Sequence, residues 1–232
     1  MNKIRVYAAS VEELKDEALF LSRYQNVSME RRKKIDQFLF KKDKMLSLAA
    51  ELLLEEALRR AGVHNWKIHY GDNGKPYIDG LYFNLSHSGE QVMCAVSERE
   101  VGCDVEKVTD IELEIAGRFF YGTEYDRIME QTTVQGRCDM FFRLWTLKES
   151  FMKATGLGMK LPLDAFRIDI TEKQEQWNKT AGENILENRI RVRQQVNMEN
   201  YYFKEYEFQD GYKYAACGLV PEFENMEFVS LK

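Results

Sequence analysis

The sequence predicts an α+β protein in which helices and short antiparallel strands occur in two successive sets. Three patterns indicate this: apolar residues alternate over residues 4–8, they recur at three- and four-residue intervals over 45–57, and strand-like runs follow residue 166. The first set gives way to the second near Glu106, so we expect two halves, 1–106 and 107–232. With only three prolines and no Ser/Gly-rich linker, we expect these halves to pack together.

The helices of the first half are marked by their ends. Ser10 and Glu13 have the spacing of a capping box and predict a helix over about residues 11–24. Ser28 is a second N-cap, placed before a helix that carries a basic cluster. The long helix that contains residues 45–57 is expected to end at Gly62, because glycine commonly follows a last helical turn.

Short strands are expected at residues 82–85, 92–96 and 101–105, where β-branched and aromatic residues are frequent. Only a few residues around Glu98 and Arg99 separate the last two. The pair therefore reads as a β-hairpin.

The second half is predicted to begin with three helices. They cover residues 112–120, a segment capped by Thr123 with Asp126, and residues 137–155, where Gly156 marks the end. Alternating apolar residues then predict strands at 166–170, 190–196, 201–208 and 212–219.

The composition, 44% apolar and 31% charged, is that of an ordinary soluble globular protein. A net charge of −5 argues against nucleic acid or a membrane surface as a partner. Residues 31–44 are an exception with a net charge of +5, which predicts a surface for a small polyanionic ligand. Because no apolar run approaches ~18 residues and no signal peptide is recognisable, we expect a cytoplasmic protein, and we expect a monomer.

The four cysteines show no paired spacing such as C-x-x-C, so reduced thiols are expected. The three histidines form no cluster with each other or with cysteine, which argues against a zinc site. Any metal ion would have to use oxygen ligands.

Two acids stand out in the run VGCDVE, residues 101–106. Asp104 and Glu106 are two residues apart, so on a strand they project from the same face and can bind one hard cation. The plainer alternative is a strand end that exposes two acids to solvent.

A second stripe of functional side chains is predicted in LWTLKESFMK. On a helix Trp145, Glu149 and Lys153 lie at i, i+4 and i+8 along one face. The alternative here is a Glu/Lys surface pair beside a core tryptophan. Taken with the strand acids, Glu149 completes an oxygen ligand set that suits Mg²⁺ and a phosphate-containing substrate, and Lys153 would face the same phosphate.

The segment NLSHSG, residues 84–89, adds hydroxyl, imidazole and backbone donors suited to a phosphate. Ser86 and His87 are adjacent on a predicted strand and point to opposite faces, which argues against a nucleophile and base pair made of these two. A polar strand end is the alternative.

Three segments of the chain are FNLSHSG, VGCDVEK and WTLKESFMK. Together they resemble motifs of the 4′-phosphopantetheinyl transferases of the Sfp (surfactin-synthetase-activating) type. The resemblance extends across most of the chain through further segments in the family's order, which are SMERRKK, DNGKPYI, RFFYGTEY and GYKYAACG. The resemblance implies two similar α/β halves, each with a small mainly antiparallel sheet and packed helices, and a ligand cleft between them. It also implies transfer of the 4′-phosphopantetheine arm of coenzyme A to a serine of an apo acyl or peptidyl carrier protein, with release of adenosine 3′,5′-bisphosphate.

The resemblance also implies roles for individual residues. The metal ligands would be Asp104, Glu106 and Glu149, for Mg²⁺ or Mn²⁺, and Lys153 would lie near the diphosphate. The coenzyme A contacts would be Ser86 and His87 beside the phosphates, Gly74, Lys75 and Pro76 beside the adenine, and Arg31, Lys34 and Ser47 near the 3′-phosphate. Arg31 stands where a lysine is familiar, and Ser47 where a threonine is.

Several alternatives stay open at this point. Lys153 and His87 would stabilise phosphate charge, whereas Glu149 is either the base for the carrier serine, a metal ligand or both, with Glu124 as a weaker alternative base. A magnesium-dependent nucleotide pyrophosphatase and an idle module that binds coenzyme A or a carrier protein are the rival functions. The sequence does not say whether the carrier belongs to fatty acid or secondary metabolite biosynthesis.

Overall fold

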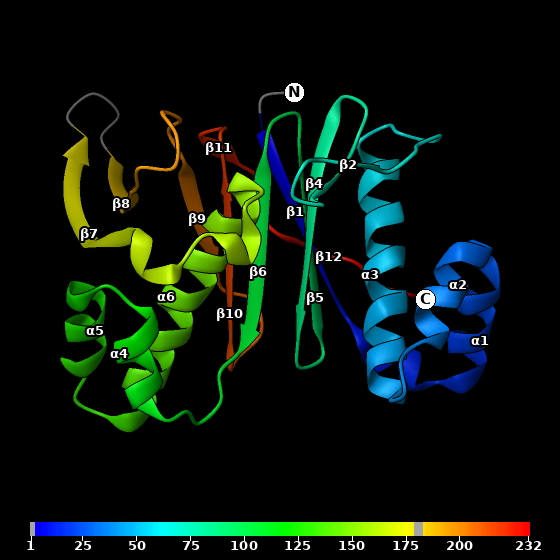
Figure 1. Ribbon diagram of the computed structural model, residues 1–232, viewed down its shortest axis with the longest axis horizontal. Coiled ribbons are helices and arrows are strands. Elements are labelled where there is room, and N and C mark those ends of the chain that lie inside the picture. Colours follow the sequence, from blue (N-terminus) through cyan, green and yellow to red (C-terminus); the bar gives the residue numbers. More distant parts are fainter. Residues whose placement is uncertain (1–2, 179–182) are drawn as a thin grey trace.

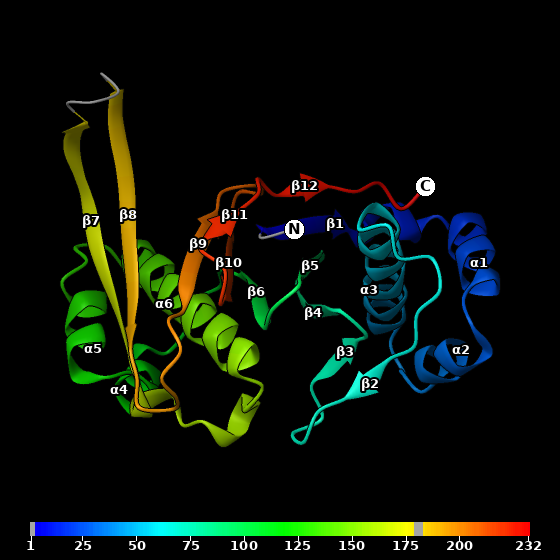
Figure 2. The same ribbon diagram turned by 90° about the horizontal axis from the view of Figure 1, so that it is seen from above.

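Two β-sheets lie side by side in the middle of the molecule, and helices cover their outer faces (Figures 1 and 2). The computed structural model describes residues 3–178 and 183–232. The larger sheet has the order β11-β1-β5-β4-β3-β2, with β12 also paired to β1. Its strands are β1 (Lys3–Ser10), β2 (His69–Tyr70), β3 (Pro76–Ile78), β4 (Leu81–Ser88), β5 (Gln91–Ser97), β11 (Glu222–Phe223) and β12 (Glu227–Phe228).

The smaller central sheet is antiparallel, with the order β6-β10-β9. Its strands are β6 (Val101–Lys107), β9 (Tyr202–Tyr206) and β10 (Tyr212–Gly218). A separate antiparallel hairpin of β7 (Arg167–Asn178) and β8 (Glu183–Arg193) projects from this side of the molecule (Figure 2).

The helices divide between the two outer faces. On the side of the larger sheet lie the 3₁₀ segment η1 (Val11–Lys15), α1 (Glu17–Asn26), α2 (Met29–Asp36) and α3 (Lys41–Arg60). On the side of the smaller sheet lie α4 (Ala116–Phe119), α5 (Gly122–Met129) and α6 (Val134–Thr155), with short 3₁₀ segments η2 (Leu113–Ile115), η3 (Gly158–Lys160) and η4 (Leu163–Ala165).

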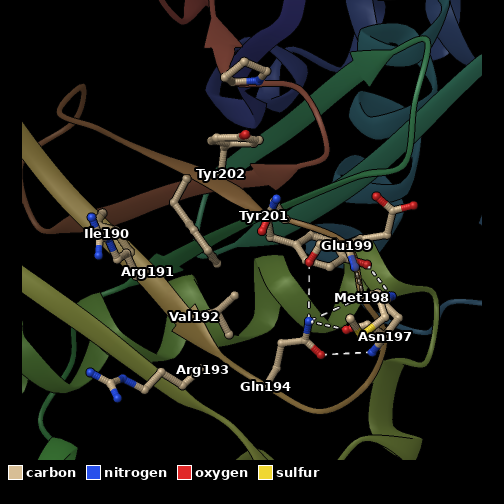
Figure 3. A pocket seen from close by; sticks show the side chains of 13 residues that line it. Ile190, Arg191, Val192, Arg193, Gln194, Asn197, Met198, Glu199, Tyr201 and Tyr202 are labelled. Atoms are coloured by element: carbon tan, nitrogen blue, oxygen red, sulfur yellow. Dashed lines mark hydrogen bonds between the residues drawn. The ribbon is translucent and has the colours of Figure 1, made fainter.

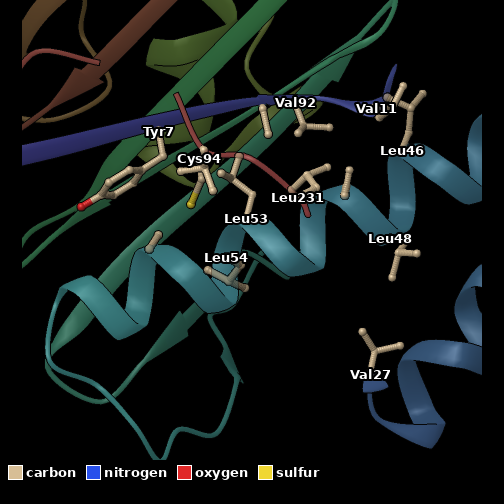
Figure 4. Close-up of a cluster of buried hydrophobic side chains, with 14 of the residues drawn as sticks. Tyr7, Val11, Val27, Leu46, Leu48, Leu53, Leu54, Val92, Cys94 and Leu231 are labelled. Atoms are coloured by element: carbon tan, nitrogen blue, oxygen red, sulfur yellow. The ribbon is translucent and has the colours of Figure 1, made fainter. Parts of the chain in front are cut away.

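Three apolar clusters hold these layers together. The first lies between α3 and the larger sheet, where Leu53 and Leu54 meet Tyr7 and Cys94 (Figure 4). Burial of such side chains is worth about 1.5–3 kcal/mol each before entropy is subtracted. A second cluster packs α6 against the smaller sheet and the β7–β8 hairpin, and a third fills the space between the two sheets. Because the third cluster is shared, the sheets are joined by a continuous apolar layer.

The predicted α+β class and the long helices are confirmed. Helix α3 is followed by Gly62, and α6 ends at Gly156, both with positive φ, as an αL position after a helix requires. All four cysteines are free and buried. Whether the two sheets correspond to domains divided at residue 106 stays a prediction.

The predicted hairpin around Glu98 and Arg99 is wrong. Strand β5 pairs with β1 and β4, whereas β6 pairs with β10 from the end of the chain. The short connection therefore carries the chain from one sheet to the other. Sequence spacing favours a local hairpin, and the distant partner β10 overrides it.

Two predicted helix starts also differ from the observed ones. Ser10 caps the short η1 segment, and Asp16 then caps α1, so the expected single helix is broken. Glu13 accepts hydrogen bonds from Ser230 and Leu231 near the C-terminus instead of completing the capping box. For α5, the N-terminus is capped by Glu124, which accepts from the Tyr121 N–H, and not by Thr123 with Asp126.

Among the described residues, none of the helices combines the length and the apolarity that a bilayer-spanning helix needs.

Candidate active site at the junction of the two sheets

The side chains on one face of β4 make hydrogen bonds to groups on β6. Since side chains alternate along a strand, residues 84, 86 and 88 share this face. Their links include Asn84 Oδ1, which accepts from the Cys103 N–H (2.9 Å), Ser86 Oγ, which donates to Asp104 Oδ1 (2.7 Å), and Ser88 Oγ, which donates to Glu106 Oε2 (2.6 Å). Two of these links end on the acids that the sequence singled out, so the acids lie where the two sheets meet.

Lys153 of α6 completes a cluster with Asp104 and Ser86. Its Nζ lies 2.6 Å from Asp104 Oδ1 and 3.1 Å from Ser86 Oγ. Asp104 Oδ2, in contrast, is buried and has no hydrogen-bond partner. A buried carboxylate oxygen without a partner is costly, and such atoms in a native structure often await a ligand or ion.

The close approach of α6 to β6 depends on Gly102. A Cβ at this position would lie 2.1 Å from Ser150 O and 2.4 Å from Ala154 N, distances that no side chain tolerates. Glycine therefore lets the last turns of α6 pack directly on the strand. This contact brings Lys153 within reach of Asp104.

The acids of this region resist ionisation. Burial raises the pKa of Asp104, although Lys153 and Ser86 oppose the shift. Burial is also the main cause of the raised pKa values of Glu106 and Glu149, and the negative charge of Asp104 adds to both. The pKa of Lys153 is raised because attraction to Asp104 outweighs burial. Three mutually repelling carboxyl groups make a region that favours a cation.

The side chains of this region suit a hard divalent cation by chemistry. Carboxylate oxygens are the ligands that Mg²⁺ prefers, and Asp104 Oδ2 is free to accept. As they stand, no three His, Cys, Asp or Glu side chains of the described residues form a metal cluster. The Lys153 ammonium lies against Asp104 and supplies positive charge there.

His87 projects from the opposite face of β4 and is exposed to solvent. Partial desolvation lowers its pKa, with the charge of Lys153 as the second cause, while Asp43 and Asp104 oppose the shift. His87 is therefore neutral at pH 7.

Lys75 reaches from the turn before β3 to β6 and α6, the elements that carry the acid cluster of Asp104, Glu106 and Glu149. The turn is closed by hydrogen bonds from Gly71 N to Lys75 O and from Gly74 N to Gly71 O, and Gly74 has a φ of 78°. Lys75 Nζ donates to Val101 O and to Ala154 O, both at 2.9 Å. Thus the structure brings Lys75 to α6 and β6 while Pro76 begins β3.

Arg31, Lys34 and Ser47 lie on the helices outside the larger sheet. Arg31 Nη2 donates to Ser47 O at 2.6 Å, and its Nε lies 3.1 Å from Glu51 Oε2. Lys34 faces Glu30 at 3.4 Å. None of these bonds within the described residues involves the acid cluster, so the structure groups Arg31 with Ser47 and leaves their role toward a 3′-phosphate a prediction.

Two side chains that the sequence associated with the site belong to the packing of α6. Trp145 stacks on Phe141 with ring centroids 5.7 Å apart. Glu124 is buried and bonds Lys148 and the backbone N–H groups of Tyr121 and Ile168. As an alternative base Glu124 is wrong, because its oxygens are already engaged away from the cluster.

A hollow of about 960 Å³ lies elsewhere, between β8 and β9 (Figure 3). Its loop is organised by Gln194, which donates to Asn197 O and accepts from Asn197 N. None of the acid-cluster residues lines this hollow.

With this geometry established, comparison with known proteins identifies the family. The model of the "4'-phosphopantetheinyl transferase superfamily" matches residues 100–217, and the model "4'-phosphopantetheinyl transferase, N-terminal" matches residues 15–99. The chain belongs to the 4′-phosphopantetheinyl transferase superfamily. Members of this superfamily transfer phosphopantetheine from coenzyme A to carrier proteins.

Individual phosphopantetheinyl transferases are similar over most of their length. The chain is 34% identical over 212 residues to 4′-phosphopantetheinyl transferase gsp of Aneurinibacillus migulanus, covering 89% of this chain and 82% of the relative. It is 33% identical over 211 residues to 4′-phosphopantetheinyl transferase Sfp of Bacillus subtilis, covering 88% of each. The solved holo-[acyl-carrier-protein] synthase of Thermotoga maritima matches 51% of this chain and 61% of its own, with a TM-score of 0.36 and 18% identity.

The sequence assigns no individual role to three residues that lie at the acid cluster: Asn84 and Ser88 count only within NLSHSG, and Gly102 only within VGCDVE. Asn84 and Ser88 share the face of Ser86, a signal that the alternation along β4 already contained. Gly102 gave no signal in isolation, since its importance depends on the helix that packs against it.

Proposed function

We propose that this protein transfers the 4′-phosphopantetheine arm of coenzyme A to a serine of an apo acyl or peptidyl carrier protein. Family membership supports the reaction class. The observation that carries the proposal is the cluster of the buried Asp104 and Ser86 with Lys153, in which one Asp104 oxygen is left without a partner. A monomeric state and a cytoplasmic location stay predictions.

The transfer is a displacement at the β-phosphorus of coenzyme A. The serine oxygen forms a bond to that phosphorus, and the bond from the phosphorus to the bridging oxygen of the diphosphate breaks. The leaving group, adenosine 3′,5′-bisphosphate, keeps the electron pair of the broken bond. The serine proton passes to Glu149, whose burial raises its pKa and makes it a stronger base than an exposed glutamate.

Lys153 and His87 stabilise the oxygens of the reacting phosphate. Lys153 stays protonated because its pKa is raised, so it offers a full positive charge. His87, whose pKa is lowered, offers a hydrogen bond from a neutral imidazole. Ser86 supplies a hydroxyl that accepts from Lys153 and donates to Asp104.

Mg²⁺, or Mn²⁺ in its place, would be held by oxygens of Asp104, Glu106 and Glu149. When bound, the ion would neutralise the charge of the diphosphate. The raised pKa values of all three acids and the partnerless Asp104 Oδ2 support this ligand set.

The remaining coenzyme A contacts are proposed from the resemblance together with local charge. Arg31 and Lys34 belong to a run of four cations on α2, and Arg31 already contacts the backbone of Ser47, which supports a 3′-phosphate site there. The turn of Gly74, Lys75 and Pro76 is proposed to lie beside the adenine.

The direct test is to incubate the protein with coenzyme A, Mg²⁺ and an apo carrier protein and to weigh the carrier by mass spectrometry. A mass gain of one phosphopantetheine arm supports the proposal. Adenosine 3′,5′-bisphosphate without a gain on the carrier would indicate a pyrophosphatase, and neither product would indicate a binding module. Carriers of fatty acid, polyketide and peptide synthetases, tested in parallel, identify the preferred partner.

A Glu149→Gln variant separates the two roles of this residue. If Glu149 is the base, the variant still binds coenzyme A and transfers very slowly, and a higher pH recovers part of the rate. If Glu149 is chiefly a ligand, excess Mg²⁺ or Mn²⁺ restores the rate instead. An unchanged rate at ordinary Mg²⁺ would remove Glu149 from the mechanism.

A further inference from the structure

Lys75 connects the larger sheet to both elements that carry the acid cluster. Its Nζ donates to Val101 O on β6 and to Ala154 O on α6, both at 2.9 Å. Among the described residues it forms no ion pair with a carboxylate. The ammonium thus donates hydrogen bonds to two backbone carbonyls, one on β6 and one on α6.

The environment of this ammonium is largely dry. Burial lowers the pKa of Lys75 to about 8, and Glu100 opposes the shift only in part. Lys75 Cδ also lies 3.4 Å from the position of a Cβ on Gly156, so its aliphatic chain packs against the end of α6. Lys75 is partly buried, and desolvating an ammonium without an acid beside it is costly, so its two hydrogen bonds offset that cost.

The two carbonyls mark the place where β6 and α6 are closest. Val101 precedes Gly102, which allows the helix to approach, and Ala154 follows Lys153, which bonds Asp104. A cation between the carbonyls near a helix C-terminus is favourable and fixes the spacing of the two elements.

We infer that Lys75 is a positioning residue, which holds α6 against β6 so that Lys153 meets Asp104 and Ser86. This inference adds to the proposed function and rests on it in the transfer assay below. The proposed adenine contact belongs to the backbone of the turn, whereas the inference concerns the Lys75 ammonium, which is engaged with the protein's own backbone.

The chain offers a matched control in Lys160. Its Nζ donates to Asn73 Oδ1 at 2.8 Å, so it links the same turn to the segment after α6, but it is exposed and bonds neither β6 nor α6. Lys75→Met and Lys160→Met therefore remove the same ammonium group from a partly buried and an exposed link.

The first measurement is steady-state transfer with varied coenzyme A. Lys75→Met is expected to lower kcat by about 10–100-fold, as loss of a supporting partner does at other sites, with KM for coenzyme A changed less than about twofold. Lys75→Arg, which keeps the charge and the donors, recovers most of kcat, and Lys160→Met stays near wild type. A raised KM with normal kcat would make Lys75 a coenzyme A contact, and normal values of both would also overturn the inference.

Amide hydrogen exchange provides a readout that does not depend on transfer. Lys75→Met is expected to exchange faster than wild type at residues 150–155 and 101–104, whereas Lys160→Met is not. If wild type transfers nothing, the proposed function fails while this result still decides the positioning role. Should Lys75→Met not fold, Lys75→Gln, which keeps one amide donor, is measured in its place, and unchanged exchange there contradicts the inference.

Discussion

Helix α6 carries two lysines, five residues apart, that each pair with a buried acid but are used in different ways. Lys148 is completely buried, and its Nζ donates to Leu163 O at 2.8 Å and to Phe166 O at 2.7 Å. It also lies 2.9 Å from Glu124 Oε2 and 4.2 Å from the centre of the Phe166 ring. All three donors of this ammonium are therefore used within the protein.

Lys153 pairs with Asp104, and only one of the two carboxylate oxygens of this acid is hydrogen-bonded. Asp104 Oδ1 is bonded to Lys153 and Ser86, and Asp104 Oδ2 has no partner. The two lysines also shift in opposite directions: burial lowers the pKa of Lys148, whereas Asp104 raises that of Lys153.

An ion pair on a buried carboxylate can therefore have two uses, which depend on whether the carboxylate is fully hydrogen-bonded. Where every donor and acceptor is satisfied, as between Lys148 and Glu124, the pair fastens α6 to α5 and to the segment before β7. Where an oxygen is left open, as on Asp104, the pair retains capacity for a ligand. Burial alone does not separate the two cases.

The largest expected effect is on stability, from Lys148→Met. This change leaves Glu124 buried without its cation, so the free energy of unfolding should fall by about 3–5 kcal/mol. Urea unfolding followed by circular dichroism measures the loss. Adding Glu124→Gln should restore part of it, and a loss below about 1 kcal/mol in the single variant would contradict the fastening role.

Asp104→Asn should act on transfer instead. The amide keeps the shape but removes the charge and one acceptor, so the transfer rate should fall by about 100-fold or more. Asp110→Asn, an exposed acid six residues further on, is the matched control and should behave as wild type. Transfer by Asp104→Asn at the control's rate would remove the acid cluster from the reaction.

Gly102→Ala tests whether the approach of α6 to β6 serves the site. The added Cβ collides with Ser150 O and Ala154 N, and such overpacking costs about 1–3 kcal/mol. Transfer should fall as well, because Lys153 moves away from Asp104. Gly122→Ala is the control, since nothing lies within 4 Å of a Cβ there. Equal stability of the two variants would argue against a tight contact.

The smallest effect concerns the titration of His87. Its pKa should lie below the ordinary 6.5, so that it becomes protonated only at a more acidic pH. Lys153→Met removes a nearby positive charge and should raise this pKa toward 6.5, whereas Lys148→Met should leave it unchanged. NMR titration of the imidazole measures both shifts, and an equal response to the two variants would show that His87 does not sense Lys153.

Part of this arrangement is predictable from sequence. The alternation over residues 101–106 places Asp104 and Glu106 on one face, and the capping pattern marks the end of α6 at Gly156. Such local signals depend on backbone geometry alone, so they survive folding.

The rest depends on what packs against each face. The helical stripe groups Trp145 with Lys153, but Phe119, Phe120 and Phe141 draw Trp145 into an aromatic cluster. Lys75 has backbone carbonyls as partners, which leave no pattern in the sequence. The pairing of β6 with β10 likewise joins segments far apart in the chain, and no local rule predicts it.

The comparison of the two lysines is tested most directly by the transfer rates of Lys153→Met and Lys148→Met, measured at a temperature where both are folded and corrected for the folded fraction. The account predicts that Lys153→Met is at least about 100-fold slower than wild type per folded molecule. It predicts that Lys148→Met transfers at close to the wild-type rate per folded molecule, despite its lower stability. Equal losses of rate in the two variants, or a loss confined to Lys148→Met, would contradict the division of α6 into a fastening lysine and a reacting one.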